Sequence, residues 1–412
     1  MITEAAKTLT DSLRLFTPCP PAADRECWEK LPEDLKARLI RNGEAYLHYE
    51  YPALTAVDFM EFTRSGNRSR YPALHWDVPR GENKSRYQDR LFARRTALDS
   101  LVLAECAEHR GRFLDDIING LYLICEENAW QLPAHNSYIR DTPQFPLPDV
   151  TRPVIDLFAA ETASVLAVAE YLLRSELKEV SPFLSVMIDH ELETRIFTPY
   201  LSEHFWWMGD GKSHMNNWTV WCTQNVLLSA FTRPLPKETQ TAILTKAAGS
   251  IDYFLAEYGE DGCCDEGAQY YRHAGLCLFG CLEILNGITD HAFSFAWGQE
   301  KIRNIASYIL NVHVDTVYYV NFADCSPVAG RCNAREYLFG KRTGNQALME
   351  FAASDYQNSE DPLTLDEHNL FYRLQTVFSH EEMMQYDRNP VIVHRDLYYE
   401  SVGLFMARDS RL

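Results

Sequence analysis

The sequence lacks the short motifs that mark several common enzyme classes. It contains no GxSxG, no GxxxxGKS/T, no GxGxxG and no HExxH, the patterns typical of α/β-hydrolases, phosphate-binding loops, dinucleotide-binding folds and zinc proteases. No two of its 11 cysteines are spaced as CxxC, so we expect no structural zinc site of the usual kind. We likewise expect no cofactor, and any catalytic site must be built from other polar residues.

Long hydrophobic runs and a secretory signal are also missing. No stretch of about 18 apolar residues occurs, so no membrane span is predicted. The first residues, MITEAAKTLTDSLRLF, lack the basic-then-apolar order of a signal peptide. The cysteines are odd in number, and Cys222, Cys277 and Cys281 fall within apolar helical stretches, which is typical of reduced thiols. We therefore expect a cytoplasmic protein.

Positive charge is scarce. Lys and Arg total 39 against 58 Asp and Glu, which gives a formal net charge of −19. Such a field disfavours binding to nucleic acid and to anionic membranes. If the ligand is itself an anionic sugar, its cleft must be locally positive, and a short oligosaccharide is easier to admit than a polymer. The oligomeric state is left open by the sequence.

Helical periodicity is abundant, and 46% of the residues are hydrophobic, enough for a large core. Amphipathic stretches predict helices near residues 26–43, 92–108, 112–128, 152–174, 182–198, 217–231, 238–257, 267–286, 299–313, 343–354 and 363–376. Because short loops join them, neighbouring helices are expected to pair in antiparallel fashion. No fixed-period repeat is visible. The pattern predicts a mainly α fold, a toroid or solenoid of helix pairs, over residues 1–385.

The end of the chain differs in character. Residues 391–409, VIVHRDLYYESVGLFMARD, are rich in Val, Tyr and Phe and predict strands. Because an isolated hairpin is marginal in water, this segment either packs on the helices or opens a further β domain. We favour the second alternative and treat residues 386–412 as the start of a β-sandwich that is truncated or absent here.

Two segments combine aromatic and polar side chains at helix ends. In ENAWQLPAHNS (127–137), His135 and Asn136 follow a helix, and the residues alone favour a buried turn. In FWWMGDGKSHMNNWTVW (205–221), a Gly-rich turn leads to His214, Asn216 and Asn217. One of the two asparagines is expected to cap the helix, and the other projects its amide where anions are favoured.

Two further segments carry titratable groups. In EDGCCDEGAQYYRHAG (260–275), Tyr270 and Tyr271 point about 100° apart on a helix, so only one of them can face a given cleft. Such tyrosines are usually core residues, but nearby Arg272 and His273 would favour a phenolate and a lowered pKa. In YYVNFADCSP (318–327), Asp324 is expected to hold an Arg or His, with structural pairing as an equal alternative.

Together these segments resemble the heparinase II/III-like polysaccharide lyases. The resemblance rests on RIFTPYL with FWWMG (195–209), NNW (216–218), DGCCDEGAQYYRH (261–273) and VNFADCSP (320–327), with WQLPAHN and IDLFAAETASVLA as further support, and covers about residues 90–330. It implies an (α/α) toroid, an incomplete barrel of antiparallel helix pairs. The family's catalytic Asn and Tyr map to Asn217 and Tyr271, with Asn216 as a rival. In several members a catalytic His comes from a C-terminal β-sandwich.

The implied reaction is β-elimination on a uronate-containing oligosaccharide or polysaccharide. An amide neutralises the uronate carboxylate, and a Tyr or His moves the C5 proton. The expected catalytic residues are Asn217, Tyr271 and His214, and no metal is expected. The expected substrate-binding residues are His135, Asn136, Asn216, Trp207, Trp218, Glu266, Tyr270, Arg272, His273 and Asp324.

Two other functions stay open at this point. A helical-toroid glycoside hydrolase acting on uronyl oligosaccharides would use Asp265, Glu266 or Asp324 as acid and base. A non-catalytic carbohydrate-binding protein would use the same aromatic cleft without turnover. The formation of a double bond in the product separates the lyase from both.

Overall fold

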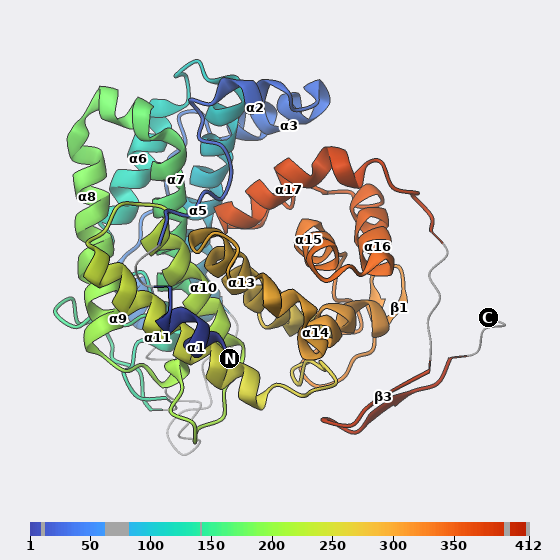
Figure 1. Cartoon of the computed structure of the whole chain (residues 1–412). Helices are drawn as coiled ribbons and strands as arrows, with labels where there is room; N and C mark the ends of the chain where they lie inside the picture. Colours follow the sequence, from blue (N-terminus) through green and yellow to red (C-terminus); the bar gives the residue numbers. More distant parts are fainter. Residues whose placement is uncertain (10–12, 62–81, 141, 391–395, 409–412) are drawn as a thin grey trace.

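We describe the fold from a computed structural model of the chain, in which residues 1–9, 13–61, 82–140, 142–390 and 396–408 are described (Figure 1). The protein is 59% helix and 3% strand, so the predicted mainly α class is confirmed. Within the described ranges no helix combines the length and apolar character needed to cross a membrane. All eleven cysteines lie in these ranges as free thiols, and all except Cys27 are buried.

In the described part of the chain, twelve longer helices build the body. They are α3 (Glu33–Glu44), α5 (Glu82–Glu108), α6 (Leu114–Cys125), α7 (Leu157–Val180), α8 (Pro182–Leu192), α10 (Asn217–Phe231), α11 (Lys237–Glu257), α13 (Gly275–Ile288), α14 (Glu300–Asn311), α15 (Ala334–Thr343), α16 (Gln346–Gln357) and α17 (Leu370–Met383). Shorter helices are α1 (Ile2–Lys7), α2 (Arg25–Glu29), α9 (Thr198–Ser202) and α12 (Ala268–Tyr271).

The longer helices pack in a definite succession. Helix α5 contacts α7, α7 contacts α10, α10 contacts α13, α13 contacts α15 and α15 contacts α17, while α17 also contacts α7. Helix α3 packs on α5, α8 on α7, α11 on α10, and α16 on α15 (Figure 1). Helices α7, α10 and α13 have buried residues on all sides, as expected for helices that are enclosed by others. Their polar side chains are therefore the unusual feature of the interior.

Most predicted helices are present, with informative differences at their ends. The predicted helix 26–43 is divided at Pro32, because proline lacks the N–H that a helix interior needs. The predicted helix 182–198 ends at Leu192 and continues as a π-helical turn, Glu193–Phe197. The predicted helix 267–286 is divided into α12 and α13 at residues 272–274. Helix α15 was not predicted, because AREYLFGKRT carries few apolar residues.

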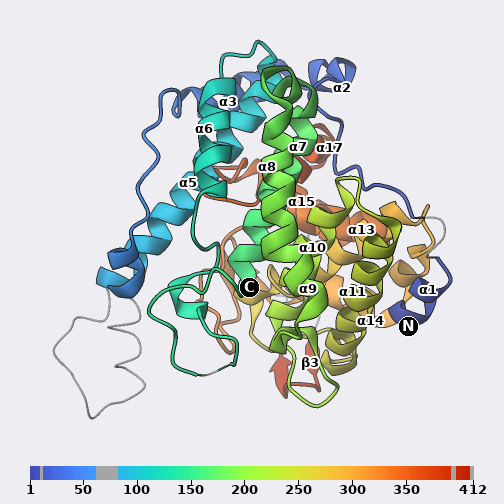
Figure 2. The same ribbon diagram turned by 90° about the vertical axis from the view of Figure 1, so that its left-hand side faces the viewer.

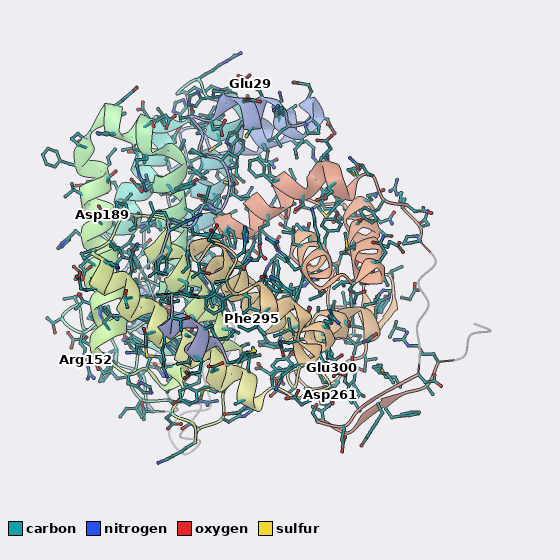
Figure 3. All side chains as sticks on the ribbon, in the orientation of Figure 1. Glu29, Arg152, Asp189, Asp261, Phe295 and Glu300 are labelled. Atoms are coloured by element: carbon teal, nitrogen blue, oxygen red, sulfur yellow. The ribbon has the colours of Figure 1, made fainter. Side chains whose placement is uncertain are left out.

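The strands predicted near the end of the chain form a small hairpin. Strands β3 (Leu397–Tyr399) and β4 (Leu404–Met406) pair in antiparallel fashion. Strands β1 (His313–Asp315) and β2 (Tyr318–Tyr319) form a separate antiparallel pair. The hairpin lies at one end of the helical body (Figure 2). Tyr399 is buried against Tyr308, with ring centroids 5.6 Å apart. Ser401 donates to Asp261, which is labelled near the hairpin in Figure 3. The hairpin thus packs on the helices, and a β domain that follows it stays a prediction.

Candidate functional site

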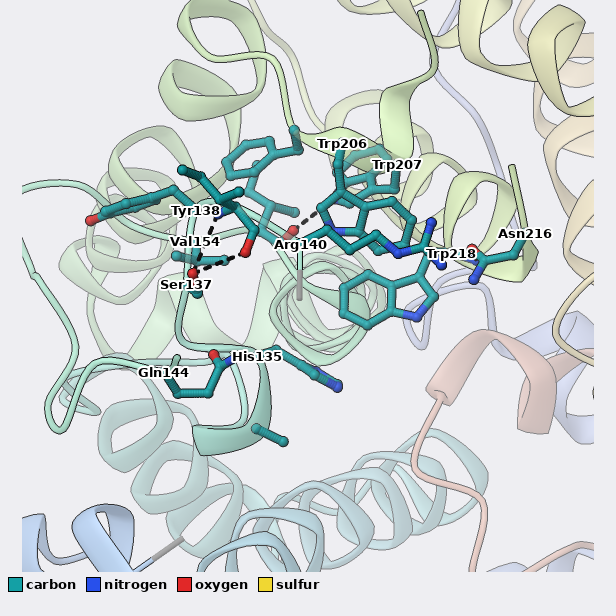
Figure 4. A pocket seen from close by; sticks show the side chains of 14 residues that line it. His135, Ser137, Tyr138, Arg140, Gln144, Val154, Trp206, Trp207, Asn216 and Trp218 are labelled. Atoms are coloured by element: carbon teal, nitrogen blue, oxygen red, sulfur yellow. Dashed lines mark hydrogen bonds between the residues drawn. The ribbon is translucent and has the colours of Figure 1, made fainter. Parts of the chain in front are cut away.

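A cavity of about 220 Å³ opens beside the start of α10, and we call it the aromatic pocket (Figure 4). Three segments meet there: the loop after the 3-10 turn Pro133–His135, the turn Trp206–Met208, and the first turn of α10. It is lined by Ala134, His135, Ser137, Tyr138, Ile139, Arg140, Gln144, Val154, Ile155, Phe205, Trp206, Trp207, Asn216 and Trp218. Aromatic walls with a few polar groups are typical of small-ligand sites.

Trp206 and Trp218 provide flat faces on this pocket. Their ring centroids are 5.0 Å apart, and both side chains are partly exposed. The Arg140 guanidinium carbon lies 4.3 Å from the Trp206 ring centre (Figure 4). The many small dispersion contacts between a flat ring and the C–H face of a pyranose suit such a surface to a sugar. The sequence predicted Trp218 and the segment 205–221 as part of a binding site, but it did not single out Trp206 or Arg140.

His135 is held at the pocket by a buried carboxylate. Its Nδ1 lies 2.7 Å from Oδ2 of Asp156, which is fully buried and also caps α7 through the Ala159 N–H. The imidazole lies edge-on to Trp218, with centroids 4.6 Å apart. Because Asp156 occupies Nδ1, the other nitrogen, Nε2, is the one that a ligand can meet. His135 therefore lies where it was predicted, in the lining of a pocket.

Three other predicted binding residues serve the structure of the pocket. The Trp207 indole is 1% exposed and donates to the Ile155 carbonyl. The Asn136 amide is buried between Gln131 and the Phe145 carbonyl, so its prediction as a substrate contact is wrong. The Asn216 side chain caps α10 by accepting from the Trp218 N–H at 3.1 Å. Asn216 is thus the capping asparagine of the pair.

Asn217 is the asparagine with an unsatisfied amide. It is the first residue of α10 and only 3% exposed, and in the described part of the chain its buried Oδ1 meets no hydrogen-bond partner. Since unpaired buried polar atoms are rare, they point to a missing partner. The positive end of the α10 dipole lies at the same place. The unpaired atom is a carbonyl oxygen and needs a donor such as a sugar hydroxyl, whereas the Nδ2 group of the same amide can donate to an oxyanion. The backbone N–H of Asn217 already bonds to the Glu266 carboxylate.

Acidic groups gather near Asn217. Burial raises the pKa of Glu266, the charge of Asp265 adds to this, and a hydrogen bond with the Asn217 backbone opposes it. His214 is 65% exposed and lies between Glu257 (2.8 Å) and Asp265 (3.5 Å). The imidazole is thus tied to two carboxylates at the surface. His214 is not among the residues that line the aromatic pocket.

The predicted catalytic Tyr271 is in the core. It is 0% exposed, and its hydroxyl donates to the Ala306 carbonyl at 3.3 Å. Burial raises the pKa of Tyr271 well above its ordinary value, whereas the sequence predicted a lowered pKa; that prediction is wrong. The Arg272 guanidinium is also used within the structure, because its Nη2 donates to the Arg331 carbonyl at 2.5 Å. Tyr270 is the partly exposed member of the pair.

His273 opens a second group of polar residues, which we call the central cluster. Its ring stacks on Trp221 of α10 at 4.0 Å, and the Tyr270 ring lies 6.3 Å away. Trp221 comes one helical turn after Asn217, so the two side chains share one face of α10. The cluster also includes Glu161 of α7, Arg335 of α15, and Glu367, His368, Asn369 and Tyr372 at the start of α17.

Glu161 connects these elements. Its Oε1 accepts from Asn369 Nδ2 at 3.0 Å and faces the Trp221 indole N–H at 3.4 Å. Its Oε2 lies 3.4 Å from Nε2 of His368. A carboxylate that is 4% exposed needs such partners to stay ionised. Although burial opposes it, His368 and Asn369 hold the pKa of Glu161 below its ordinary value.

The two histidines of the central cluster have opposite protonation preferences. Burial, followed by the nearby charge of Arg335, lowers the pKa of His273 to about 3. Burial also acts against the cationic form of His368, but the hydrogen bond and charge of Glu161 outweigh it and raise the pKa to about 9. At neutral pH His273 is therefore a neutral base and His368 a cation. Titratable neighbours with separated pKa values are typical of acid–base sites.

The prediction that Asp324 holds an Arg or His is wrong. Asp324 is exposed and forms no ion pair within the described ranges, so it does not hold an Arg or His. Its charge instead helps to raise the pKa of Glu266. Across the described residues no group of three His, Cys, Asp or Glu side chains is arranged to hold a metal ion.

Sequence reasoning missed the central cluster except for His273. One signal was present: Glu161 is the one charged residue in the mostly apolar run LFAAETASVLA. A charged residue in such a run must be paired when the helix is enclosed. Glu367, His368 and Asn369 precede α17 without a recognisable motif. A search of protein-family models and of curated proteins gave no match to the chain.

Proposed function

We propose that this protein is a lyase that cleaves uronate-containing oligosaccharides by β-elimination. The observation that carries the proposal is the place of the buried Asn217 amide, which lies at the N-terminus of α10 and one turn from the stacked pair Trp221 and His273. The aromatic pocket beside it, with Trp206 and Trp218, supplies a surface for a sugar ring. Carboxylate binding, acid–base groups and a sugar surface are what this chemistry requires.

We further propose that the helices form an incomplete (α/α) toroid. The packing of α5, α7, α10, α13, α15 and α17 in succession, with α17 returning to α7, supports a ring of inner helices. The packing of α3, α8, α11 and α16 on individual members of that ring supports an outer layer. Such a ring brings residues from distant parts of the sequence to its centre, as in the central cluster.

The proposed roles follow from the chemistry of the C5 proton. That proton is weakly acidic while the uronate carboxylate stays charged, so Nδ2 of Asn217 would donate to the carboxylate and stabilise the enolate-like intermediate. His135, whose Nδ1 is held by Asp156, would take the C5 proton through Nε2. The electron pair would form the C4–C5 double bond as the C4–O bond breaks. The Tyr270 hydroxyl would give a proton to the leaving oxygen, which suits a phenol better than acting as a base.

The adjacent tyrosines provide a matched test. We expect Tyr270→Phe to lower the rate of unsaturated product formation by about 100-fold or more, because it removes the proton donor. We expect Tyr271→Phe to retain activity and to lose about 1 kcal/mol of stability with its hydrogen bond to Ala306. The measurement is ultraviolet absorbance of the 4,5-unsaturated uronate over a panel of uronate oligosaccharides, with unfolding curves for both variants.

The opposite pattern would overturn this assignment. If Tyr270→Phe keeps full activity while folded Tyr271→Phe loses it, the buried residue is the one that reacts. If the wild-type protein forms no unsaturated product with any uronate in the panel, the lyase proposal fails as a whole.

One observation favours a second candidate, a glycoside hydrolase. Burial raises the pKa of Glu367, and the charge of Glu161 raises it further, while the pKa of Glu161 itself is lowered. Two carboxyl groups whose pKa values are moved in opposite directions are what hydrolysis of a glycosidic bond uses. A hydrolase would incorporate oxygen from labelled water into the reducing sugar, and Glu367→Gln would abolish this. Product with a double bond and no labelled oxygen supports the lyase.

A further inference from the structure

Arg335 is a cation without a carboxylate partner in the interior of the helical body. It lies in the first turn of α15 and is only partly exposed. Its guanidinium carbon lies 3.6 Å from the centre of the Tyr372 ring, and its Nη2 faces Sγ of Cys277 at 3.6 Å. Within the described ranges no carboxylate oxygen lies within 4.0 Å of it, whereas neighbouring Arg272 and Arg331 each reach an acidic side chain.

The position of Arg335 in its helix makes this more unusual. The N-terminus of α15 is already the positive end of the helix dipole, and Asn333 and Glu336 complete a capping box there. An arginine at this place is unfavourable for the helix unless an anion is present. Enclosed charges are almost always paired, so the missing partner is expected to be a ligand.

The surroundings of Arg335 are those of a prepared site. The hydroxyl of Tyr372 accepts from Nε2 of Gln224 at 2.8 Å, which fixes the ring on which the guanidinium lies. Arg335 is close enough to His273 to lower the pKa of that residue. The charged groups facing it are Glu367, on the α17 side, and Glu336, on its own helix, and Glu336 is shared with Arg272. The guanidinium is planar and presents paired N–H groups that match an oxyanion.

We propose that Arg335 binds a second oxyanion of the substrate, a sulfate or a carboxylate on a sugar other than the one held by Asn217. This inference rests on the proposed function and narrows its substrate class to oligosaccharides with two acidic groups near the cleaved bond. One acidic group would be held at the start of α10 and the other at the start of α15. A neutral or singly charged disaccharide would leave Arg335 unpaired and bind more weakly.

Direct binding tests the site without any need for turnover. We would titrate inorganic sulfate and D-glucuronate by calorimetry into the wild-type protein, Arg335→Lys, Arg335→Met and the control Arg303→Met, which removes an exposed arginine of α14. We expect Arg335→Met to weaken binding of the preferred anion by about 10-fold or more and Arg335→Lys to weaken it less, since Lys keeps the charge but loses the paired donors. Arg303→Met should match the wild type.

Each outcome decides the proposal. Preference for sulfate over glucuronate, lost in Arg335→Met, identifies a sulfated sugar as the source, and the reverse preference identifies a second uronate. Equal affinity in Arg335→Met and Arg303→Met overturns the site, as does a wild-type protein that binds neither anion. If Arg335→Met does not fold, Arg335→Lys carries the same comparison.

Turnover separates this proposal from the proposed function. If the anion binds through Arg335 but no unsaturated product forms from any uronate, the lyase proposal fails while the anion site stands. If product forms, and kcat/KM for a doubly acidic disaccharide is equal in Arg335→Lys, Arg335→Met and the wild type, the second-anion role of Arg335 fails while the lyase stands.

Discussion

At the scale of single residues, the opposite protonation of two neighbouring histidines is the main electrostatic feature. His368 gains a proton because Glu161 is fixed beside it by Asn369, and His273 loses one because burial and Arg335 act on it. Salt screens buried charges less than it screens surface ion pairs, so both pKa shifts are expected to change little with ionic strength. A small number of buried contacts therefore sets the state of both rings at neutral pH.

His368 makes stability depend on pH in a defined window. Its pKa is about 9 in the folded protein against about 6.5 when unfolded, so the folded state binds the proton more tightly. The stabilisation is fully present below pH of about 6.5 and is lost as the pH rises through 9. We expect His368→Gln to cost about 2 kcal/mol in denaturant unfolding at pH 6 and much less at pH 9.5.

A constant difference between wild type and His368→Gln across this range would contradict the ion pair with Glu161. It would show that the ring acts through packing on Phe92, whose centroid lies 4.3 Å away, and not through charge.

The sequence predicted the local placement of residues best where consecutive residues decide it, whereas their roles in a site stay predictions. His135, Asn217 and Trp218 follow from helix-end chemistry, which is written in consecutive residues. The choice between Tyr270 and Tyr271 could not be made, because it depends on which face of α12 meets α14. Glu161 and His368 are separated by about 200 residues, and only the packing of α7 against α17 brings them together.

At the scale of elements, the division between α12 and α13 positions the site. The helix pattern of residues 267–286 predicted one continuous helix, but the chain turns at Gly267 and again after Arg272. Gly267 has φ +90°, and a Cβ there would lie 2.3 Å from the Phe322 carbonyl oxygen. The short helix with Tyr270 is thus held against the loop that carries Asp324.

This contact gives a prediction with an internal control. We expect Gly267→Ala to destabilise the protein by about 2–4 kcal/mol, since the residue combines a positive φ with a backbone clash. At Gly249, inside α11, an added Cβ would meet no atom within 4 Å, so Gly249→Ala is expected to stabilise by up to about 1 kcal/mol. Thermal or denaturant unfolding of both variants measures these changes in stability. If Gly267→Ala is as stable as the wild type, the loop 320–326 can move away from the added Cβ.

Boundaries of other elements show the same limits of local information. Helix α10 (Asn217–Phe231) was predicted to the residue, because Asn216 caps it and the apolar pattern is continuous. Helix α15 was missed, although its cap Asn333 with Glu336 is a recognisable capping box. Its interior carries Arg, Lys and Arg, and its burial comes from packing on α16 and α17, which the local pattern does not contain.

At the scale of the whole molecule, the net charge of −19 opposes the ligand that the site is proposed to bind. The Debye length shrinks from about 30 Å at 0.01 M salt to about 8 Å at 0.15 M, so salt screens the distant acidic surface before it screens Arg335 and the α10 N-terminus. We expect the association rate of an acidic disaccharide to rise several-fold over this range, measured by stopped-flow Trp fluorescence. A rate that falls with salt would indicate a positive field at the entrance.

The free cysteines can report the order in which the helices of the protein unfold. They are spread from Cys19 to Cys332, over the N-terminal segment, the enclosed helices and the loop before α15, and only Cys27 is partly exposed. A thiol reagent therefore marks Cys27 at once, whereas every other cysteine waits for its own element to come apart. The order in which the remaining thiols are modified would show, without any introduced label, which helices unfold first. It would also show whether the helices around the central cluster unfold last.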